Sequence, residues 1–104
     1  MHKAISVTVI GAGLMGHGIG QVFARAGHEV VITDPNATVL NMALERVEAN
    51  LVSEGVDVNR VLCNMRVDGT LQSAVAQADL VIEAAPEKLE LKQKLFADVA
   101  AAAP

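Results

Sequence analysis

Glycines near the start of the chain have the spacing of a phosphate-binding turn. They form a G-x-G-x-x-G pattern in the run Gly11-Ala12-Gly13-Leu14-Met15-Gly16. Gly11 permits a tight turn, Gly13 lets a pyrophosphate approach the backbone without an intervening Cβ, and Gly16 lets a helix pack closely on a strand. Asp34 follows about 20 residues later, close to the spacing at which a carboxylate meets the ribose hydroxyls of an adenosine. The pattern therefore predicts a dinucleotide-binding site built from Gly11–Gly16 and Asp34.

The residues on either side of the turn predict the strands and the helix that such a site needs. Ser6–Ile10 is short, β-branched and mostly apolar, which is typical of a strand buried in a parallel sheet. A helix is predicted from Leu14 until Gly27 stops it, and its free N–H groups and positive dipole end would face the phosphates. We expect the inner face of this helix to consist of Leu14, Ile19, Val22, Phe23 and Ala26. Glu29–Thr33 is predicted to be a second strand, which ends at Asp34.

The choice between NAD and NADP depends on the residues at the end of the second strand. A carboxylate at Asp34 would repel a 2′-phosphate, and Pro35-Asn36-Ala37-Thr38 supplies no Arg or Lys to hold one. The sequence therefore predicts NAD as the cofactor. The alternative interpretation is a glycine turn that only tightens a strand–helix–strand unit.

The rest of the chain continues the alternation of helices and strands. Asp34-Pro35-Asn36 offers a cap and a proline at a helix start. Apolar positions then recur at three- and four-residue steps, which predicts an amphipathic helix that runs to about Ser53 and that Gly55 ends. Its inner face is expected to contain Val39, Leu40, Ala43, Leu44, Val47 and Leu51. Asp57 and Thr70 are predicted to cap two short helices, strands are expected at 65–67 and 80–84, and a further helix is expected to begin at Glu87.

This order of elements predicts an α/β fold, a Rossmann-like doubly wound parallel sheet with right-handed crossovers. About four strands are visible, in the expected spatial order 3-2-1-4, whereas a complete domain of this kind has six. We therefore expect residues 1–104 to be the N-terminal part of an NAD-binding domain with an incomplete sheet.

Composition and charge exclude several other classes of protein. The net charge of −4 argues against nucleic acid and anionic membranes as partners, and no apolar run approaches the roughly 20 residues of a membrane span. A single cysteine, Cys63, excludes an internal disulfide, and we expect its side chain to be a small buried hydrophobe. The start of the chain leaves no room for a signal peptide, so a cytoplasmic protein is predicted.

Several stretches of the chain together form a more specific pattern than the glycine turn alone. They are the run GAGLMG at 11–16, Ala26–Val30, Asp34, the block ADLVIEA at 78–84, Pro86-Glu87, Leu91-Lys92 and Leu95-Phe96. In these residues the chain resembles the NAD-binding domain of the 3-hydroxyacyl-CoA dehydrogenase family, which includes 3-hydroxybutyryl-CoA dehydrogenases. The resemblance covers essentially the whole chain.

The resemblance implies oxidation of an L-3-hydroxyacyl-CoA to the 3-ketoacyl-CoA, with hydride passing to NAD, in fatty acid or butanoate metabolism. It implies that Gly11–Gly16 holds the pyrophosphate and Asp34 the adenosine ribose, and that Glu87 and Lys92 line the cofactor site. For Glu87 the alternative is a charge that suits the start of a helix, and for Lys92 it is a solvated side chain. The resemblance also implies an acyl-CoA substrate and a homodimer for the full-length enzyme.

The groups that carry out the chemistry in the family have no counterpart that we can assign in this chain. Relatives use a His–Glu pair, with supporting Ser and Asn, from a region downstream, and the histidine acts as general base. Here His17 is expected to be a neutral surface residue, and His28 to lie in a turn at the end of the sheet away from the cofactor. No catalytic residue and no metal ligand is therefore assigned. The helical dimerisation domain of relatives is also expected to be absent.

We consequently expect the chain alone to show no dehydrogenase activity. Two alternatives remain open at the level of sequence. One is a non-catalytic dinucleotide-binding or sensing module, and the other is part of a different NAD-linked β-hydroxyacid dehydrogenase.

Overall fold

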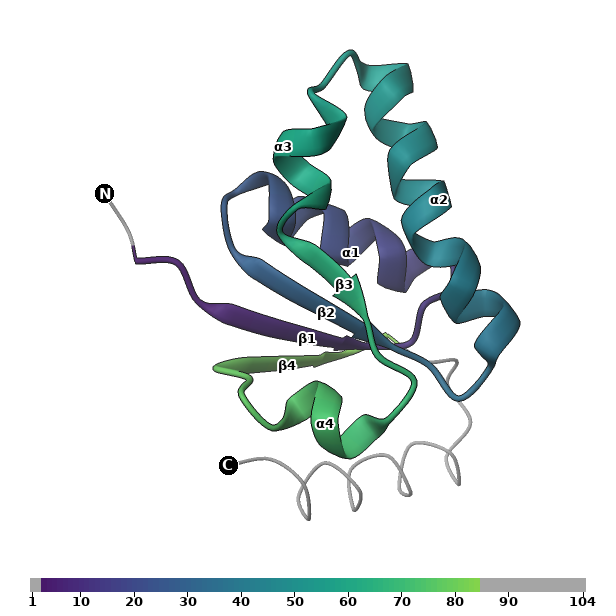
Figure 1. The fold of residues 1–104 in the computed structure, drawn as a ribbon, viewed down its shortest axis with the longest axis vertical. Helices are drawn as coiled ribbons and strands as arrows, with labels where there is room; N and C mark the ends of the chain where they lie inside the picture. Colours follow the sequence, from purple (N-terminus) through teal and green to yellow (C-terminus); the bar gives the residue numbers. More distant parts are fainter. Residues whose placement is uncertain (1–2, 85–104) are drawn as a thin grey trace.

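The fold is organised around a parallel sheet, which the computed structural model describes together with its helices over residues 3–84 (Figure 1). The strands are β1 (Ser6–Ile10), β2 (Glu29–Thr33), β3 (Met65–Val67) and β4 (Leu80–Glu83). They lie in the order β3-β2-β1-β4, and every neighbouring pair is parallel. The predicted Rossmann-like α/β fold and its strand order are confirmed for the described residues.

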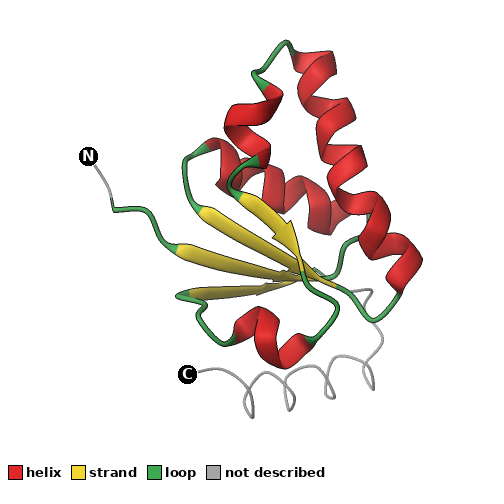
Figure 2. Cartoon of the chain, viewed as in Figure 1, coloured by secondary structure: helices red, strands yellow, loops and turns green. Residues whose placement is uncertain are grey.

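Helices cover both faces of this sheet (Figure 2). On one face lie α1 (Leu14–Arg25), α2 (Ala37–Glu54) and α3 (Val58–Leu62), and on the other lies α4 (Leu71–Val75). The path from β1 to β2 to β3 steps in one direction across the sheet, and the chain then reverses to place β4 beside β1. Because parallel crossovers are right-handed, this reversal puts α4 on the face opposite α1.

The ends of α2 and α3 are set by their capping residues. The Oδ1 atom of Asn36 accepts a hydrogen bond from the backbone N–H of Val39 (3.2 Å), and α2 ends at Gly55, whose φ of 70° is left-handed. Asp57 caps α3 in the same way, by accepting from the backbone N–H of Arg60 (3.3 Å). These two helices are confirmed as predicted.

Two predicted boundaries differ in detail from the structure. β4 ends at Glu83, one residue earlier than expected. Thr70 is the N-cap of α4, but its side chain makes no capping hydrogen bond, and its backbone N–H instead donates to Oδ1 of Asp68 (2.9 Å). The helix expected from Glu87 lies outside the described residues.

The core lies between the sheet and the helices on the α1 side. Buried aliphatic residues of β1, β2 and α2 meet there: Val7, Val9, Val30, Ile32, Leu40, Ala43, Val47 and Leu51. Val39 and Leu44 pack against them and are half-buried, so the predicted inner face of α2 is confirmed. This packing fixes α1 and α2 relative to the carboxyl ends of the strands.

The predicted inner face of α1 is wrong at three of its positions. Leu14 is 85% exposed, Val22 is 67% exposed, and Ala26 is exposed as well. The buried residues of α1 are instead Gly16, His17, Gly20, Gln21 and Ala24. The physical reason is close packing, since a Cβ at Gly20 would lie 3.1 Å from the Cδ1 atom of Ile32. A small residue therefore faces the strands at this point of α1. Ile19 and Phe23 of the predicted face do pack against the core, where they are half-buried.

Two expectations drawn from composition can also be compared with the structure. Cys63, predicted to be buried, is exposed: it follows α3 at the surface, and its Sγ–H group donates to the carbonyl oxygen of Arg60 (3.2 Å). The short helix that precedes it turns only Val61 fully inward. Within residues 3–84, no helix is long and apolar enough to cross a membrane.

Candidate cofactor-binding site

The carboxyl ends of β1 and β2 bring the glycine turn and Asp34 together. The backbone N–H of Gly11 donates to the carbonyl oxygen of Thr33 (2.7 Å), which joins the turn to the last residue of β2. The backbone N–H of Ala12 donates to Oδ2 of Asp34 (2.8 Å). In Figure 1 the strand arrowheads converge where α1 and α2 begin. The two sequence features predicted to form one site are therefore in direct contact.

Glycine is needed at the three positions of the turn for different structural reasons. Gly11 has a φ of 109°, a conformation that residues with a side chain rarely adopt, so the tight turn predicted there is confirmed. A Cβ at Gly16 would lie 1.6 Å from the carbonyl oxygen of Gly11, so the predicted close packing of helix on strand is confirmed too. A Cβ at Gly13 would have no atom within 4 Å, which leaves the space beside its backbone open.

The start of α1 presents backbone N–H groups to this open space. Gly13 is the N-cap of α1 and makes no side-chain capping hydrogen bond. The first backbone N–H groups of a helix have no acceptor within the helix, and the helix dipole adds partial positive charge at the same end. Leu14 and Met15 point away from the core here, with 85% and 67% of their surfaces exposed. This end of α1 can therefore bind an anionic group such as a pyrophosphate.

Both carboxylate oxygens of Asp34 accept backbone hydrogen bonds. Oδ2 accepts from Ala12 and Oδ1 accepts from the N–H of Asn36 (2.7 Å), so the side chain is fixed between the turn and the start of α2. The residue remains partly exposed. Each carboxylate oxygen has two lone pairs, so one on each stays available for a further donor such as a ribose hydroxyl.

His17 is buried, with 4% of its surface exposed, and its predicted surface position is wrong. Its Nδ1 atom lies 2.9 Å from the carbonyl oxygen of Gly13. The reason is its place on α1: His17 is on the same inner face as Gly20, Gln21 and Ala24. His28 follows α1 as predicted, in the turn before β2, where its Nδ1 atom accepts from the backbone N–H of Ile5 (3.1 Å).

Glu83 is a residue of this region to which the sequence analysis gave no separate role. It pairs with Ile10 across the ladder, at the carboxyl end of β4 beside the end of β1. Its Oε2 atom is buried and has no hydrogen-bond partner among the residues that the structure describes. Its place in the sequence could have indicated a site residue, because it is a charged residue at the end of an apolar strand and ligands of such sheets bind beyond the carboxyl ends of the strands. Glu87 and Lys92 lie outside the described range.

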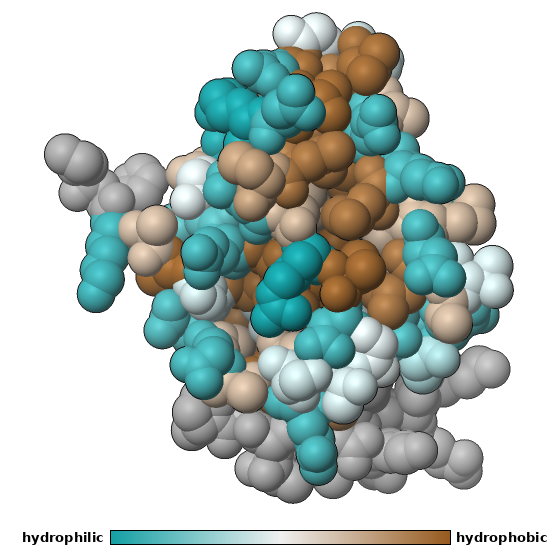
Figure 3. Space-filling model, viewed as in Figure 1, coloured by the Kyte–Doolittle hydropathy of each residue, from teal (hydrophilic) through white to brown (hydrophobic). Residues whose placement is uncertain are grey.

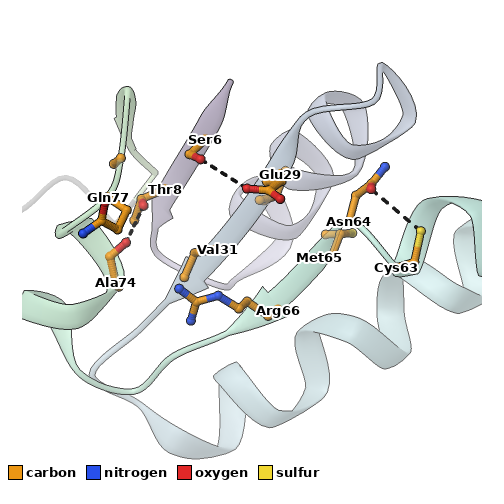
Figure 4. Close-up of a pocket in the computed structure, with 12 residues that line it drawn as sticks. Ser6, Thr8, Glu29, Val31, Cys63, Asn64, Met65, Arg66, Ala74 and Gln77 are labelled. Carbon is orange, nitrogen blue, oxygen red and sulfur yellow. Dashed lines mark hydrogen bonds between the residues drawn. The ribbon is translucent and has the colours of Figure 1, made fainter. Parts of the chain in front are cut away.

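A hollow of about 350 Å³ lies elsewhere on the sheet (Figure 4). It is lined by the first residues of three strands, Ser6, Glu29 and Met65, together with Arg66 and Gln77. It therefore lies toward the amino ends of the strands, on the far side from the turn. Of the residues predicted to bind the cofactor, those that lie within the described range do not line it.

Comparison with a known protein family decides what this site belongs to. A model of the NAD-binding domain of 3-hydroxyacyl-CoA dehydrogenase matches residues 6–104. The chain belongs to the 3-hydroxyacyl-CoA dehydrogenase family. The match extends from β1 through the glycine turn and Asp34 to β4 and beyond, and it confirms both the family resemblance and NAD as the cofactor of this domain.

Individual relatives show how much of a family member the chain represents. It is 41% identical over 106 residues to 3-hydroxyadipyl-CoA dehydrogenase of Escherichia coli (strain K12), across 95% of this chain and 22% of that protein. It is 37% identical over 102 residues to the mitochondrial hydroxyacyl-coenzyme A dehydrogenase of Rattus norvegicus, across 86% of this chain and 32% of that protein. The chain thus spans about a third or less of these two relatives.

A solved structure supports the fold independently of the family model. The crystal structure of 3-hydroxybutyryl-CoA dehydrogenase from Escherichia coli K12 matches this fold with a TM-score of 0.90 at 37% identity, across 99% of this chain and 23% of that one. The strand order and the placement of the glycine turn in this chain are therefore those of a family member.

Proposed function

We propose that this chain is the NAD-binding part of an enzyme that oxidises an L-3-hydroxyacyl-CoA to the 3-ketoacyl-CoA. The observation that carries the proposal is the direct hydrogen bond from the glycine turn to Asp34, at the carboxyl ends of β1 and β2. Membership of the family supports the reaction. When bound, NAD supplies the chemistry by accepting a hydride, and the residues of this chain bind and orient it.

Each proposed site residue has a physical role. The backbone of Gly11–Gly16 binds the pyrophosphate through the free N–H groups at the start of α1. Asp34 accepts hydrogen bonds from the adenosine ribose and repels a 2′-phosphate, so that NAD is preferred over NADP. Glu87 and Lys92 line the cofactor site beyond β4, as the family resemblance implies.

The wider setting of the enzyme is also a proposal. Residues 1–104 form an NAD-binding domain, the catalytic His–Glu pair lies in a downstream region, and a helical domain completes the acyl-CoA site and forms a homodimer. The negative net charge supports the absence of nucleic acid and anionic membranes among its partners. The exposed free thiol of Cys63 supports a reducing, cytoplasmic location.

The experiment that tests the proposal is titration calorimetry of NADH and NADPH with the wild-type chain and with Asp34→Asn. Asparagine keeps the shape of the side chain and an acceptor oxygen, but it removes the negative charge. We expect the wild-type chain to prefer NADH, and the ratio of the NADPH to the NADH dissociation constant to fall about tenfold in the variant. Even in water, two unit charges at 4 Å interact by about 1 kcal/mol.

A matched control is Asp57→Asn, because Asp57 is also a carboxylate that accepts a backbone hydrogen bond but lies beyond the far end of α2. This variant should keep the wild-type ratio. Equal affinity of the wild-type chain for NADH and NADPH would contradict the role of Asp34. Lack of any binding by a folded chain would contradict the proposed NAD site in this chain.

A further inference from the structure

We propose that His17 is a positioning residue for the cofactor: its ring orients the peptide unit between Gly13 and Leu14, so that the N–H of Leu14 is held toward the pyrophosphate. The inference rests on the proposed function in that NAD is taken to occupy the turn. It concerns a residue that sequence analysis placed at the surface.

The contact of His17 with the turn is buried and specific. The Nδ1 atom lies 2.9 Å from the carbonyl oxygen of Gly13, and the backbone N–H of His17 donates to the same oxygen at 3.0 Å. A carbonyl oxygen can only accept, so Nδ1 must carry the proton of the ring, a tautomer assigned from this contact. Both lone pairs of the Gly13 carbonyl are thus engaged by one residue.

The consequence follows from the planarity of the peptide bond. The C=O of Gly13 and the N–H of Leu14 belong to one rigid plane and point in opposite directions. A second hydrogen bond to the oxygen restricts rotation of that plane, and the N–H at its other end is restricted with it. Leu14 is the first residue of α1, so this N–H has no acceptor within the helix and faces outward.

The position of Gly13 explains why such a contact has an effect here. Gly13 is the N-cap of α1, makes no side-chain capping hydrogen bond, and has no atom within 4 Å of where its Cβ would stand. Apart from the two hydrogen bonds to its carbonyl oxygen, neither a side chain of its own nor a described neighbour beside its Cα therefore limits the rotation of its peptide. A glycine also has more backbone freedom to lose than any other residue. The ring of His17 reduces this freedom before the cofactor arrives.

Two variants separate the hydrogen bond from the space that the ring fills. His17→Leu keeps a bulky apolar side chain and removes the donor. His17→Asn places an N–H group close to the position of Nδ1 and removes most of the ring. Helix propensity favours Leu over Asn, so an effect on helix stability alone would rank the two variants in the opposite order to our expectation.

The first measurement is the affinity of the 104-residue chain for NADH by calorimetry. We expect His17→Leu to bind NADH about threefold to tenfold more weakly than wild type, the range of one net hydrogen bond, and His17→Asn to stay within about twofold. Wild-type affinity in a folded His17→Leu variant would overturn the inference.

The second measurement needs no cofactor and therefore separates this inference from the proposed function. It is the NMR order parameter of the Leu14 N–H in the free chain, with amides in the middle of α2 as internal controls. We expect a value near 0.85 in wild type and His17→Asn, and a fall toward about 0.6 in His17→Leu. An unchanged value in His17→Leu would overturn the positioning role even if NADH binds. If no variant binds NADH, the proposed function fails, and the order parameter still decides whether His17 orders this peptide.

Discussion

A methyl group added at Gly16 would stand 1.6 Å from the carbonyl oxygen of Gly11, well inside van der Waals contact. Backbone, not a flexible side chain, occupies that space, so α1 would have to move away from β1. We expect Gly16→Ala to lower the free energy of unfolding by about 2 to 3 kcal/mol and to abolish NADH binding. The measurement is urea unfolding followed by circular dichroism, since the chain has no Trp or Tyr to report by fluorescence.

Gly18→Ala is the control for Gly16→Ala. It lies on the same helix, and a Cβ there would meet no atom within 4 Å. Alanine is favoured over glycine within a helix by roughly 1 kcal/mol, so this variant should be slightly more stable than wild type and bind NADH normally. Similar losses in both variants would show that the effect comes from α1 in general and not from the contact with Gly11.

At the scale of residues, the sequence predicts the positions where backbone geometry requires glycine better than it predicts which side chains are buried. The need for glycine at 11 and 16 follows from spacing alone, because a tight turn and a close approach exclude a Cβ. The burial of His17 does not follow, because it depends on how far α1 rotates about its axis. The exposure of Cys63 was missed for a similar reason, since the residue that follows a short helix can face either the core or the solvent.

The turn between β3 and α4 is held by one carboxylate. Asp68 accepts from the hydroxyl of Ser73 through Oδ2 (2.6 Å) and from the backbone N–H of Thr70 through Oδ1 (2.9 Å). These two hydrogen bonds, with a smaller contribution from the charge of Arg66, lower the pKa of Asp68 from its ordinary value of 3.8. The turn between β3 and α4 is therefore stabilised by the ionised form of the Asp68 side chain.

The sign of the resulting pH dependence follows from linkage. A lowered pKa adds stability above the unfolded value of 3.8, and this stability is lost as the pH falls through the folded value. We expect Ser73→Ala to be less stable than wild type at pH 7, by under about 1 kcal/mol at this surface turn. Urea unfolding at decreasing pH should show the difference shrinking below pH 3.8.

Ser53→Ala provides the comparison, because Ser53 is an exposed serine whose hydroxyl has no partner within the described residues. Its effect on stability should not change with pH. A difference between wild type and Ser73→Ala that stays constant down to pH 3 would contradict the proposed hydrogen bond to ionised Asp68.

Elements were predicted well where local chemistry defines them. Asn36, Gly55 and Asp57 set helix ends through hydrogen bonds to neighbouring backbone or through a left-handed φ, and these effects act within a few residues. The inner face of α1 was predicted only in part, because Gly20 packs against Ile32, and that contact joins residues from two elements. Hydrophobic periodicity assumes that larger apolar residues face inward, and it gives no signal for a position where a glycine packs closely on a strand.

At the scale of the whole chain, the proposed reaction requires more than the NAD site. A general base must remove the proton of the substrate hydroxyl, and an enclosed site must hold the acyl-CoA. We therefore expect the 104-residue chain to show no oxidation of NADH with acetoacetyl-CoA, measured at 340 nm, under conditions where calorimetry shows NADH to be bound. Turnover above the rate without protein would contradict this expectation and place catalytic groups within the chain.

The order of the described strands could be predicted from sequence, because the alternation of strands and helices together with the glycine turn indicates a doubly wound dinucleotide-binding sheet, for which this strand order is typical. The surface is less predictable. Apolar residues form a band across the visible face, from the end where α2 and α3 lie to the middle of the molecule (Figure 3). β4 lies at the edge of the described sheet, where Leu80 is 39% exposed. Such an edge can pair with another chain, and it agrees with the incomplete sheet expected from the strand count.

The strand order also determines when each strand can pair during synthesis of the chain. β1 leaves the ribosome first, yet it lies between β2 and β4, and the backbone N–H of Ser6 donates to Asp79, 73 residues later. At about 5 to 20 residues per second, roughly 4 to 15 seconds pass before β4 can be added. During that interval β1 has at least one unpaired edge, so a nascent chain that carries this domain is exposed to mispairing until residue 83 has emerged.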